Sequence, residues 1–457
     1  MKNRNNGKLI IVFAALAMLS GIVVFLVKFA LHGNEWAFYQ TNSHVYTDGE
    51  MTEIGKIIDR DGNVLAYSQD GKRLYSDDAD IRKATIHAVG DSSGYISTGA
   101  QNAFKEYLSG YSKVNGFYTY TGEPNNIELT IDSSISVAAM KALGDYSGCV
   151  GVCNYKTGEI LCMVSTPTYD IADINAVIAA ENGSLGSVFI NRFISSTYTP
   201  GSTFKIVTAA AALETFGEDS YKTQYQCDFG TLIDNETLSC VGCHYGISLK
   251  SAFSHSCNAY FSRLGISLGK TKMNQYAEIF GFNKDFYIDG IKAARPSYGV
   301  ENARNIDFGW SSIGQYTNQM NPLQYLCSIS AIANGGTYVE PYFLKAVYTA
   351  KGSKIYSPNP KSNAILSKES AEKIAELMDF AVSDNYGKEN FGTLDVCGKT
   401  GTAEIGENKE NSLFVGFCKD SDLPLAFVVV VEDGGSGSGS ALAVAKATLA
   451  AAEESLF

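Results

Sequence analysis

The feature that most constrains this chain is an unbroken apolar run near its start. Residues 9–27 are nineteen residues without a charged side chain, and at about 1.5 Å per residue they span the roughly 30 Å hydrocarbon core of a membrane. Lys2, Arg4 and Lys8 precede the run, so the positive-inside rule predicts a cytoplasmic tail at 1–8, a transmembrane anchor at 9–31 and an extracellular body. A cleaved signal peptide is the alternative, but the run is long for one and no clear small-x-small cleavage site follows it.

Composition narrows the classes of protein that the body can be. The 457 residues are 45% hydrophobic and 18% charged, which is enough apolar material for two or three packed domains. A formal net charge of −12 argues against partners held through phosphate contacts, so no nucleic acid is expected. Ten cysteines are too few for a disulfide scaffold in a chain of this length.

The chain divides into a mixed, polar module at 32–125 and a larger domain at 126–457. In the first, residues 55–66 predict a hairpin because Asp61-Gly62 is a strong two-residue turn. The second begins with a strand at 127–131 and a helix that Asp132 caps and that runs to about Leu143. The alternation continues as a set of strands at 149–154, 159–165, 394–400, 412–418 and 425–431 and a set of helices at 203–216, 248–254, 259–268, 322–333, 368–382 and 441–455.

This order predicts an antiparallel sheet that the two ends of the domain complete, because strands lie at both ends and helices fill the middle. The helix at 203–216 is apolar on almost every face and is therefore expected to be buried. A glycine- and serine-rich stretch at 434–440 is expected to be a flexible loop.

The start of the buried helix carries the most specific chemistry. Ser202 and Lys205 are three residues apart, which places their side chains on one helix face. Burial and the positive helix end both oppose a charged ammonium, so Lys205 can be neutral and accept the proton of Ser202. Ser267/Lys270 and Ser370/Lys373 repeat the spacing, but they lie in ordinary amphipathic context, where Lys is expected to face solvent.

Two further segments supply polar groups suited to holding a peptide. Ser256-Cys257-Asn258 falls between two predicted helices, where a turn can aim a hydroxyl and a carboxamide into a cleft. Its rivals are Ser383-Asp384-Asn385, which is typical of a helix stop, and the weaker 357–359. The residues Lys399, Thr400, Gly401 and Thr402 end the predicted strand at 394–399, whose edge can pair with an extended peptide while the lysine and the hydroxyls hold a carboxylate. Lys156-Thr157-Gly158 is similar but lies in a hairpin turn.

The ordered set Ser202/Lys205, Ser256/Asn258 and Lys399/Thr400/Gly401 resembles the three-motif signature of penicillin-interacting serine enzymes. Within them the chain is similar to class B penicillin-binding proteins, and to the penicillin-binding protein A type of Gram-positive bacteria in particular. Residues 191–205, 312–316, 321–324 and 55–66 also resemble that family. Ile54 and Asn321 depart from it, standing where the family usually has Arg and Thr.

The resemblance implies an α/β (α+β) transpeptidase fold, with an antiparallel five-stranded sheet flanked by helices and an all-helical subdomain. It also implies that 32–125 is a non-catalytic pedestal or dimerisation module. The implied reaction is cross-linking of peptidoglycan stem peptides that end in D-Ala-D-Ala, with β-lactams acylating the same serine. Ser202 is then the nucleophile, Lys205 its base and Ser256 a proton relay, while Asn258 and residues 399–402 bind the substrate.

The same resemblance implies a cell-membrane location and, as partners, a membrane glycosyltransferase and division or elongation proteins. No cofactor is expected. Three other functions stay open at this stage: a β-lactamase, a D,D-carboxypeptidase in which water replaces the acceptor amine, and a non-catalytic division or sporulation scaffold or a β-lactam sensor. A β-lactamase needs a water-activating Glu or carboxylated Lys, and a sensor needs a cytoplasmic signalling domain.

The cysteines spell one tempting motif. Cys240-Val-Gly-Cys243-His244 matches the attachment sequence of c-type haem, but it occurs once and without an evident axial partner. Zinc is discounted because a Cys pair with one His leaves a ligand missing. A disulfide from Cys227 to Cys240 or Cys243 is an alternative outside the cell. The other cysteines, Cys257 among them, are expected to be small buried apolar residues.

Overall fold

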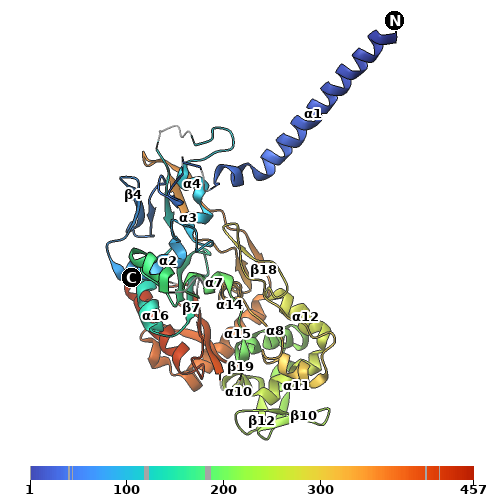
Figure 1. Cartoon of the computed structure of the whole chain (residues 1–457). Helices are drawn as coiled ribbons and strands as arrows, with labels where there is room; N and C mark the ends of the chain where they lie inside the picture. Colours follow the sequence, from blue (N-terminus) through green and yellow to red (C-terminus); the bar gives the residue numbers. More distant parts are fainter. Residues whose placement is uncertain are drawn as a thin grey trace.

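The computed structural model describes residues 2–39, 42–43, 45–117, 123–180, 187–406, 409–420 and 422–456. Met1, at the start of the predicted tail, lies outside them. Figure 1 shows a long N-terminal helix, a sheet region beside its end, and a larger body that carries helices and a second sheet.

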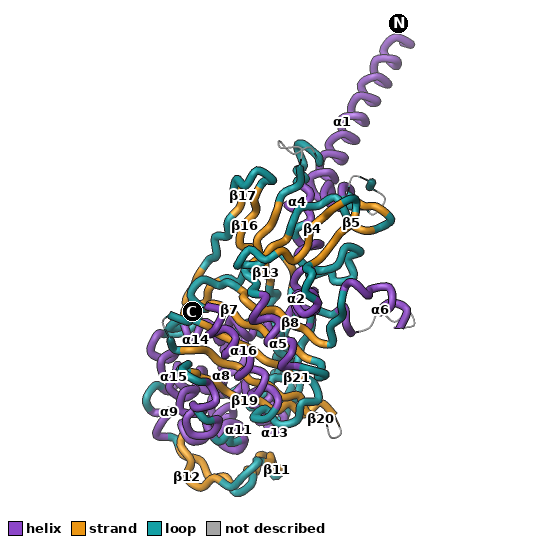
Figure 2. The backbone as a smooth tube through the Cα atoms, turned by 90° about the vertical axis from the view of Figure 1, so that its left-hand side faces the viewer, coloured by secondary structure: helices purple, strands orange, loops and turns teal. Residues whose placement is uncertain are grey.

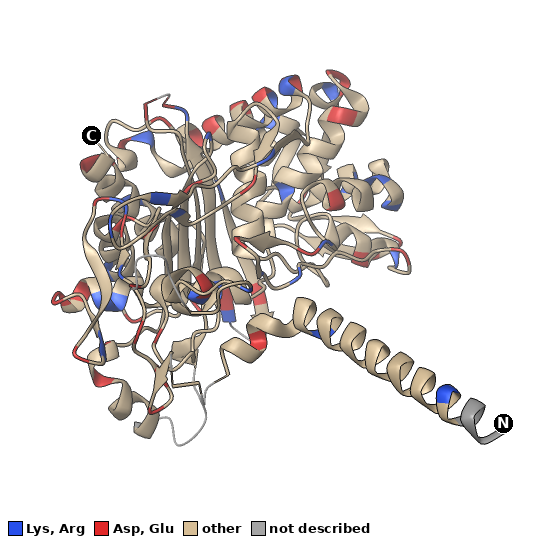
Figure 3. Cartoon of the chain, turned by 90° about the horizontal axis from the view of Figure 1, so that it is seen from above, with Lys and Arg blue, Asp and Glu red and all other residues tan. Residues whose placement is uncertain are grey.

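Helix α1 runs from Lys2 to Ala37 and projects away from the rest of the molecule (Figure 1). Figure 3 shows it as an almost uncharged rod, and the most apolar part of its segment Gly7–Ala37 is not buried against the rest of the protein. It is the one helix among the described residues that is long and apolar enough to cross a membrane. Its last turns contact the body, where Lys113 Nζ donates to the carbonyl of Ala30 at 3.0 Å. The helix is therefore compatible with a single-pass anchor.

The sheet nearest to α1 draws its strands from both predicted segments. Its order is β17-β16-β6-β3-β4-β5. Three strands come from the N-terminal module: β3 (Ile57–Ile58), β4 (Val64–Gln69) and β5 (Lys72–Tyr75). Three come from further along the chain: β6 (Asn126–Leu129), β16 (Leu344–Tyr348) and β17 (Lys354–Tyr356). The predicted hairpin at 55–66 is confirmed as β3 and β4, and Gly62 takes the positive φ of 88° that its turn requires.

The second sheet has five antiparallel strands, as the resemblance implies, and their order is β19-β20-β21-β7-β8. The two ends of the domain complete it, as the sequence predicts. Strands β7 (Gly148–Asn154) and β8 (Ile160–Thr166) come from the start of the domain, and β19 (Val396–Gly406), β20 (Lys409–Cys418) and β21 (Leu425–Val431) come from its end. Almost every residue of β7, β8 and β21 is buried, because helices cover both faces.

Helices α5 (Ser133–Leu143) and α16 (Ser440–Leu456) pack together on one face, and α14 (Pro322–Ala333) lies on the other (Figure 2). Consecutive residues of β7 face opposite sides of the sheet. The Cys153 side chain contacts Ser330 of α14 on one side. Val152 and its strand partner Cys162 face the other side, where Cys162 contacts Ser136 of α5. Asp132 caps α5 as predicted, by accepting from the N–H of Ile135 at 3.0 Å. Asn321 caps α14 by accepting from the N–H of Gln324. The Thr that the resemblance leads one to expect at this position is also a common N-cap residue, so the two side chains can fill the same role.

The helical part of the body lies beside β19. Its members are α8 (Lys205–Phe216), α10 (Leu249–Ser254), α11 (Asn258–Leu268), α12 (Lys270–Ile279), α13 (Asn305–Ser311) and α15 (Lys368–Ala381). Two small ribbons, β9 (Gln224–Cys227) with β12 (His244–Ser248) and β10 (Gly230–Ile233) with β11 (Glu236–Ser239), close its far end. The expected all-helical subdomain therefore also contains these four short strands.

Candidate active site

Ser202 lies in a tight turn wedged between two other segments. The turn is a 3₁₀ helix, Gly201–Phe204, and the α-helix α8 begins at Lys205, three residues later than Ser202 itself. The N–H of Gly201 donates to the carbonyl of Gly314 at 3.0 Å, which ties the turn to the segment at 312–316. Gly201 has a φ of +52°, and a Cβ there would lie 2.3 Å from the carbonyl oxygen of Thr402. Only glycine allows this close approach of the turn to β19.

Lys205 is fully buried, and its amine lies at the centre of the site. Its Nζ is 2.9 Å from Ser202 Oγ and 3.0 Å from Ser256 Oγ. It also lies 2.6 Å from the carbonyl oxygen of Ser256 and 2.8 Å from Asn258 Oδ1. The structure thus brings together four of the residues that the sequence singled out.

These distances define how the amine can share its protons. The carbonyl of Ser256 and the carboxamide oxygen of Asn258 can only accept hydrogen bonds, so they take up the two N–H groups of a neutral amine. The remaining lone pair is then free for a hydroxyl proton. Burial lowers the pKa of Lys205 well below its ordinary value, and the positive charge of Lys399 lowers it further. The arrangement can therefore activate a serine hydroxyl.

Ser256 occupies a strained turn between α10 and α11. Its φ of +55° is unusual for a residue with a side chain, and the strain is held by the helices on either side. Its hydroxyl contacts two lysines, because Lys399 Nζ is 3.2 Å from Ser256 Oγ and Lys205 Nζ is 3.0 Å from it. One hydroxyl oxygen thus connects the two buried amines.

Lys399 belongs to a strand that continues beyond the predicted end. The prediction that the strand stops at Lys399 is wrong, since β19 runs to Gly406 and pairs with β20 along almost its whole length. The long partner strand sustains the ladder through Thr400 and Thr402, whose side chains line a groove. Burial lowers the pKa of Lys399 to about 7, so the amine exchanges its proton near neutrality.

Tyr386 is a site residue that the sequence did not reveal. Its hydroxyl lies 2.9 Å from Thr400 Oγ1 and 3.3 Å from Lys399 Nζ. The ring comes from a π-helical turn at Val382–Tyr386 and packs edge-on against Phe414. A tyrosine after a Ser-Asp-Asn triplet carries no local signal of this role, because the contact depends on the tertiary placement of the turn.

The rival triplet at 383–385 contacts Ser254, two residues before the second motif. Ser383 Oγ donates to carbonyls of its own helix, at 3.1 and 3.0 Å. Asp384 accepts from Ser254 Oγ at 2.7 Å, and Asn385 Nδ2 donates to the carbonyl of Ser254 at 3.0 Å. Of the two rival serines, Ser256 is the one whose hydroxyl lies beside Lys205, at 3.0 Å.

A groove of about 540 Å³ runs over these residues. The lining includes Ser202, Ser256, Asn258, Thr400 and Thr402. The stretch at 434–440, expected to be a flexible loop, is held against β19 because the N–H of Gly437 donates to Thr402 Oγ1 at 3.1 Å. Ser436 and Ser438 of this loop line the groove as well.

The cysteines differ from expectation. All ten are free thiols, so the alternative of a disulfide from Cys227 is not realised in the structure. The expectation that a ligand is missing for zinc is also wrong, because Cys227 and Cys257 join Cys240 and His244 to make four potential ligands, while Cys243 lies outside this group. The sequence around Cys257 did not indicate this contact, because Cys257 lies at the start of α11, thirty residues after Cys227.

Comparisons with known proteins agree with this geometry. The sequence model of the penicillin binding protein transpeptidase domain matches residues 148–451. Peptidoglycan D,D-transpeptidase PbpA of Mycolicibacterium smegmatis is 31% identical over 90% of this chain and 91% of its own. The D,D-transpeptidase domain of peptidoglycan glycosyltransferase from Eggerthella lenta superposes with a TM-score of 0.78 at 31% identity, over 88% of this chain and 99% of that one. Penicillin-binding protein A from M. tuberculosis, solved as a ceftriaxone acyl-enzyme complex, gives 0.78 at 26% identity over 88% and 98%.

Proposed function

The chain belongs to the family of penicillin-binding protein transpeptidases, and from this we propose that it is a peptidoglycan D,D-transpeptidase that works through an acyl-enzyme on Ser202. The observation that carries the proposal is the position of Lys205 Nζ, within 3.0 Å of Ser202 Oγ, Ser256 Oγ and Asn258 Oδ1. Stem peptides ending in D-Ala-D-Ala are the substrates, and β-lactams are the inhibitors that acylate the same oxygen.

Acylation begins when Ser202 Oγ attacks the carbonyl carbon of the penultimate D-Ala. Lys205 takes the hydroxyl proton on its free lone pair as the new C–O bond forms. Ser256 Oγ, which lies 3.0 Å from Lys205 Nζ and 3.2 Å from Lys399 Nζ, then gives its proton to the departing amine of the last D-Ala and takes up the proton that Lys205 received from Ser202, so that Lys205 is neutral again. The peptide C–N bond breaks, and the acyl group stays on Ser202.

The developing negative charge on the attacked oxygen needs donors on the opposite side. We assign them to the backbone N–H groups of Ser202 and Thr402, because the turn at Gly201 approaches the Thr402 carbonyl closely and so brings the two backbones together. Each donor of this kind contributes roughly 3–4 kcal/mol in other hydrolases. An amine from a second stem peptide then attacks the acyl-enzyme, forms the cross-link and frees Ser202.

Substrate binding falls to groups along β19 and the second motif. Lys399, with a pKa lowered to about 7, can become a cation when a carboxylate binds beside it, and Thr400 and Thr402 present hydroxyls nearby, so the three suit the terminal carboxylate. Asn258, on the other wall, is placed to hold the backbone of the acyl donor. Gly401 keeps β19 close to the turn, since a Cβ there would lie 2.8 Å from Thr203 Cγ2.

The nucleophile is tested with membranes that contain the full chain and a fluorescent penicillin. Wild type should label and Ser202→Ala should not, with Ser383→Ala as the control serine variant. Labelling of Ser202→Ala at the wild-type level would refute the assignment. A bisubstrate stem-peptide assay then separates the transpeptidase from a D,D-carboxypeptidase, since only the former gives a cross-linked product.

The same proposal covers placement in the cell. Residues 1–8 lie in the cytoplasm, 9–31 cross the membrane and the remainder is extracellular, where a membrane glycosyltransferase and division or elongation proteins are the expected partners. Residues 32–125 form the non-catalytic module and 126–457 the transpeptidase domain. The apolar surface of α1 supports a membrane span. The basic residues at its start support the orientation with the N-terminus inside. External protease should remove the penicillin-labelled domain from intact protoplasts, and full protection would contradict it.

A further inference from the structure

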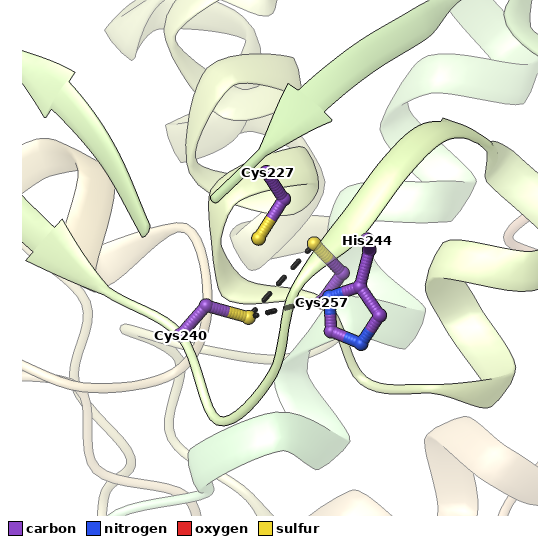
Figure 4. Close-up of side chains that lie close together, drawn as sticks. All are labelled: Cys227, Cys240, His244 and Cys257. Carbon is purple, nitrogen blue, oxygen red and sulfur yellow. Dashed lines mark hydrogen bonds between the residues drawn. The ribbon is translucent and has the colours of Figure 1, made fainter. Parts of the chain in front are cut away.

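Four side chains of the kinds that can bind a metal lie close together beside the groove. They take no part in the acyl transfer proposed above. Figure 4 shows Cys227, Cys240, His244 and Cys257 pointing toward one another. Their ligand atoms all lie within 4.8 Å of one another. Cys240 Sγ is 3.8 Å from His244 Nδ1 and 3.9 Å from Cys257 Sγ.

These separations fit a tetrahedral zinc ion. With Zn–S bonds of about 2.3 Å and Zn–N bonds of about 2.0 Å, tetrahedral ligands lie roughly 3.8 Å apart for two sulfurs and roughly 3.5 Å apart for a sulfur and a nitrogen. The measured distances are thus close to those of a coordinated set, and only small side-chain adjustments remain. Three Cys and one His form one of the usual structural zinc sets.

The cluster is carried by short two-stranded ribbons and by the start of a helix. His244 of β12 is paired with Cys227 of β9, Cys240 follows β11, and Cys257 caps α11. Two-stranded ribbons are marginally stable alone in water. Burial of Ile233, Leu238 and Ile247 holds one side of the ribbons to the body, but Phe229, Leu232, Val241 and Tyr245 are 63–83% exposed. A metal cross-link would add to the stability that this partial burial gives.

Two of the sulfurs accept hydrogen bonds from backbone N–H groups. The N–H of Asn258 donates to Cys240 Sγ at 3.3 Å, and the N–H of Tyr260 donates to Cys257 Sγ at 3.4 Å. Such outer hydrogen bonds orient metal ligands and balance their charge.

We propose that Cys227, Cys240, His244 and Cys257 bind one zinc ion as a closed structural site. Binding releases the protons of those thiols that still carry one and leaves His244 neutral, so that the centre has a net charge of about −1. The ion fastens both ribbons to the start of α11. Cys243, despite its place in the Cys-x-x-Cys pair, stays outside the set because its Sγ faces the Cys227 carbonyl and Asp228.

The site is joined to the groove through the second motif. Cys257 stands between Ser256 and Asn258, so fixing its sulfur fixes the turn that presents both side chains. Asn258 Nδ2 donates to the carbonyl of Ser239, and Ser239 and Cys240 form part of the groove wall. The ion therefore positions Ser256 and Asn258 without contacting substrate.

The test uses the untagged full chain, purified in detergent under reducing conditions with added zinc and then dialysed. Wild type and the control Cys243→Ala should contain about one zinc per chain by mass spectrometry of the metal, and Cys227→Ala and His244→Ala much less. Cobalt exchanged into wild type should give an intense thiolate-to-metal charge-transfer band in the near ultraviolet, with tetrahedral visible bands, and the band should weaken in Cys227→Ala.

Removing the metal with a chelator should slow penicillin acylation about tenfold, and zinc should restore the rate. The metal content does not depend on the proposed function, so an inert but zinc-loaded chain would overturn only that function. Zinc-free wild type, equal zinc in wild type and Cys227→Ala, or a disulfide between any two of Cys227, Cys240 and Cys257 in zinc-supplemented protein would each overturn the metal site. A variant that loses zinc but keeps its penicillin labelling in part is folded, which separates metal loss from unfolding.

Discussion

Replacing Tyr386 with Phe removes one oxygen from the substrate-binding wall and leaves the ring in place. That oxygen lies 2.9 Å from Thr400 Oγ1, 3.3 Å from Lys399 Nζ and 3.4 Å from the Thr400 backbone nitrogen. The phenylalanine ring keeps the edge-on packing of Tyr386 against Phe414. The substitution therefore tests the hydroxyl by itself.

The magnitude follows from these three contacts. A hydrogen bond contributes about 0.5–1.5 kcal/mol net, and bonds to charged groups contribute more. Two of the contacts are long, which puts them at the weak end of the range. We therefore expect a loss of about 1–2 kcal/mol in holding Lys399 and Thr400 for the carboxylate, and an acylation rate constant about tenfold lower.

The assay is the second-order rate constant for acylation by a fluorescent penicillin, with thermal unfolding measured in parallel. Tyr260→Phe is the matched control, because it also loses a buried hydroxyl, one that lies 3.3 Å from the Thr223 carbonyl, away from the groove lining. It should acylate at the wild-type rate. An acylation rate within twofold of wild type for Tyr386→Phe, or an equal loss in both variants, would refute the reasoning.

Three more predictions follow from the same groove. The pKa of Lys399 is about 7 in the folded chain and about 10.4 in the unfolded chain, so between these pH values only the unfolded chain keeps the proton, and the free energy of unfolding rises with pH. The melting temperature of wild type, relative to that of Lys399→Met, should therefore rise from pH 7 to 9. A constant difference between the two melting temperatures would contradict the lowered pKa. Gly437→Ala places a Cβ 2.3 Å from a carbonyl oxygen of β19 and should lower acylation several-fold, whereas Gly439→Ala meets an oxygen only at 3.2 Å and should not; equal rates in the two variants would show that the loop does not shape the groove. Ser256→Ala should slow acylation by about 100-fold and Ser383→Ala by less than twofold, since the Ser383 hydroxyl bonds within its own helix; the reverse order in the same labelling assay would make 383–385 the working motif.

Much of the fold was predictable because its signals are local. Asp61-Gly62 marks a turn, Asp132 caps a helix, and the all-round apolar stretch at 203–216 specifies a buried helix whatever surrounds it. The meeting of Ser202 with Lys205 follows from helical spacing. Its meeting with Ser256 and Lys399 was inferred from the order of three motifs, and the structure confirms it by contacts that run through Lys205 and Ser256.

What the sequence did not predict depends on partners distant along the chain. β19 passes through Lys399 because β20 sustains its ladder, and no residue near Lys399 encodes that length. Tyr386 reaches Thr400 only through the placement of a π-helical turn. Cys257 looked like a core residue because it is buried, and burial alone does not say which side chains face its sulfur.

The two buried lysines also explain how a chain can keep a base ready until a substrate arrives. Lys205 and Lys399 share one hydroxyl, and the positive charge of Lys399 lowers the pKa of Lys205. With its own pKa near 7, Lys399 is only partly charged before substrate binds. A carboxylate beside it favours its charged form, and the added charge makes Lys205 still less able to hold an extra proton. Recognition of the carboxylate beside Lys399 thus favours the neutral Lys205 amine that activates Ser202.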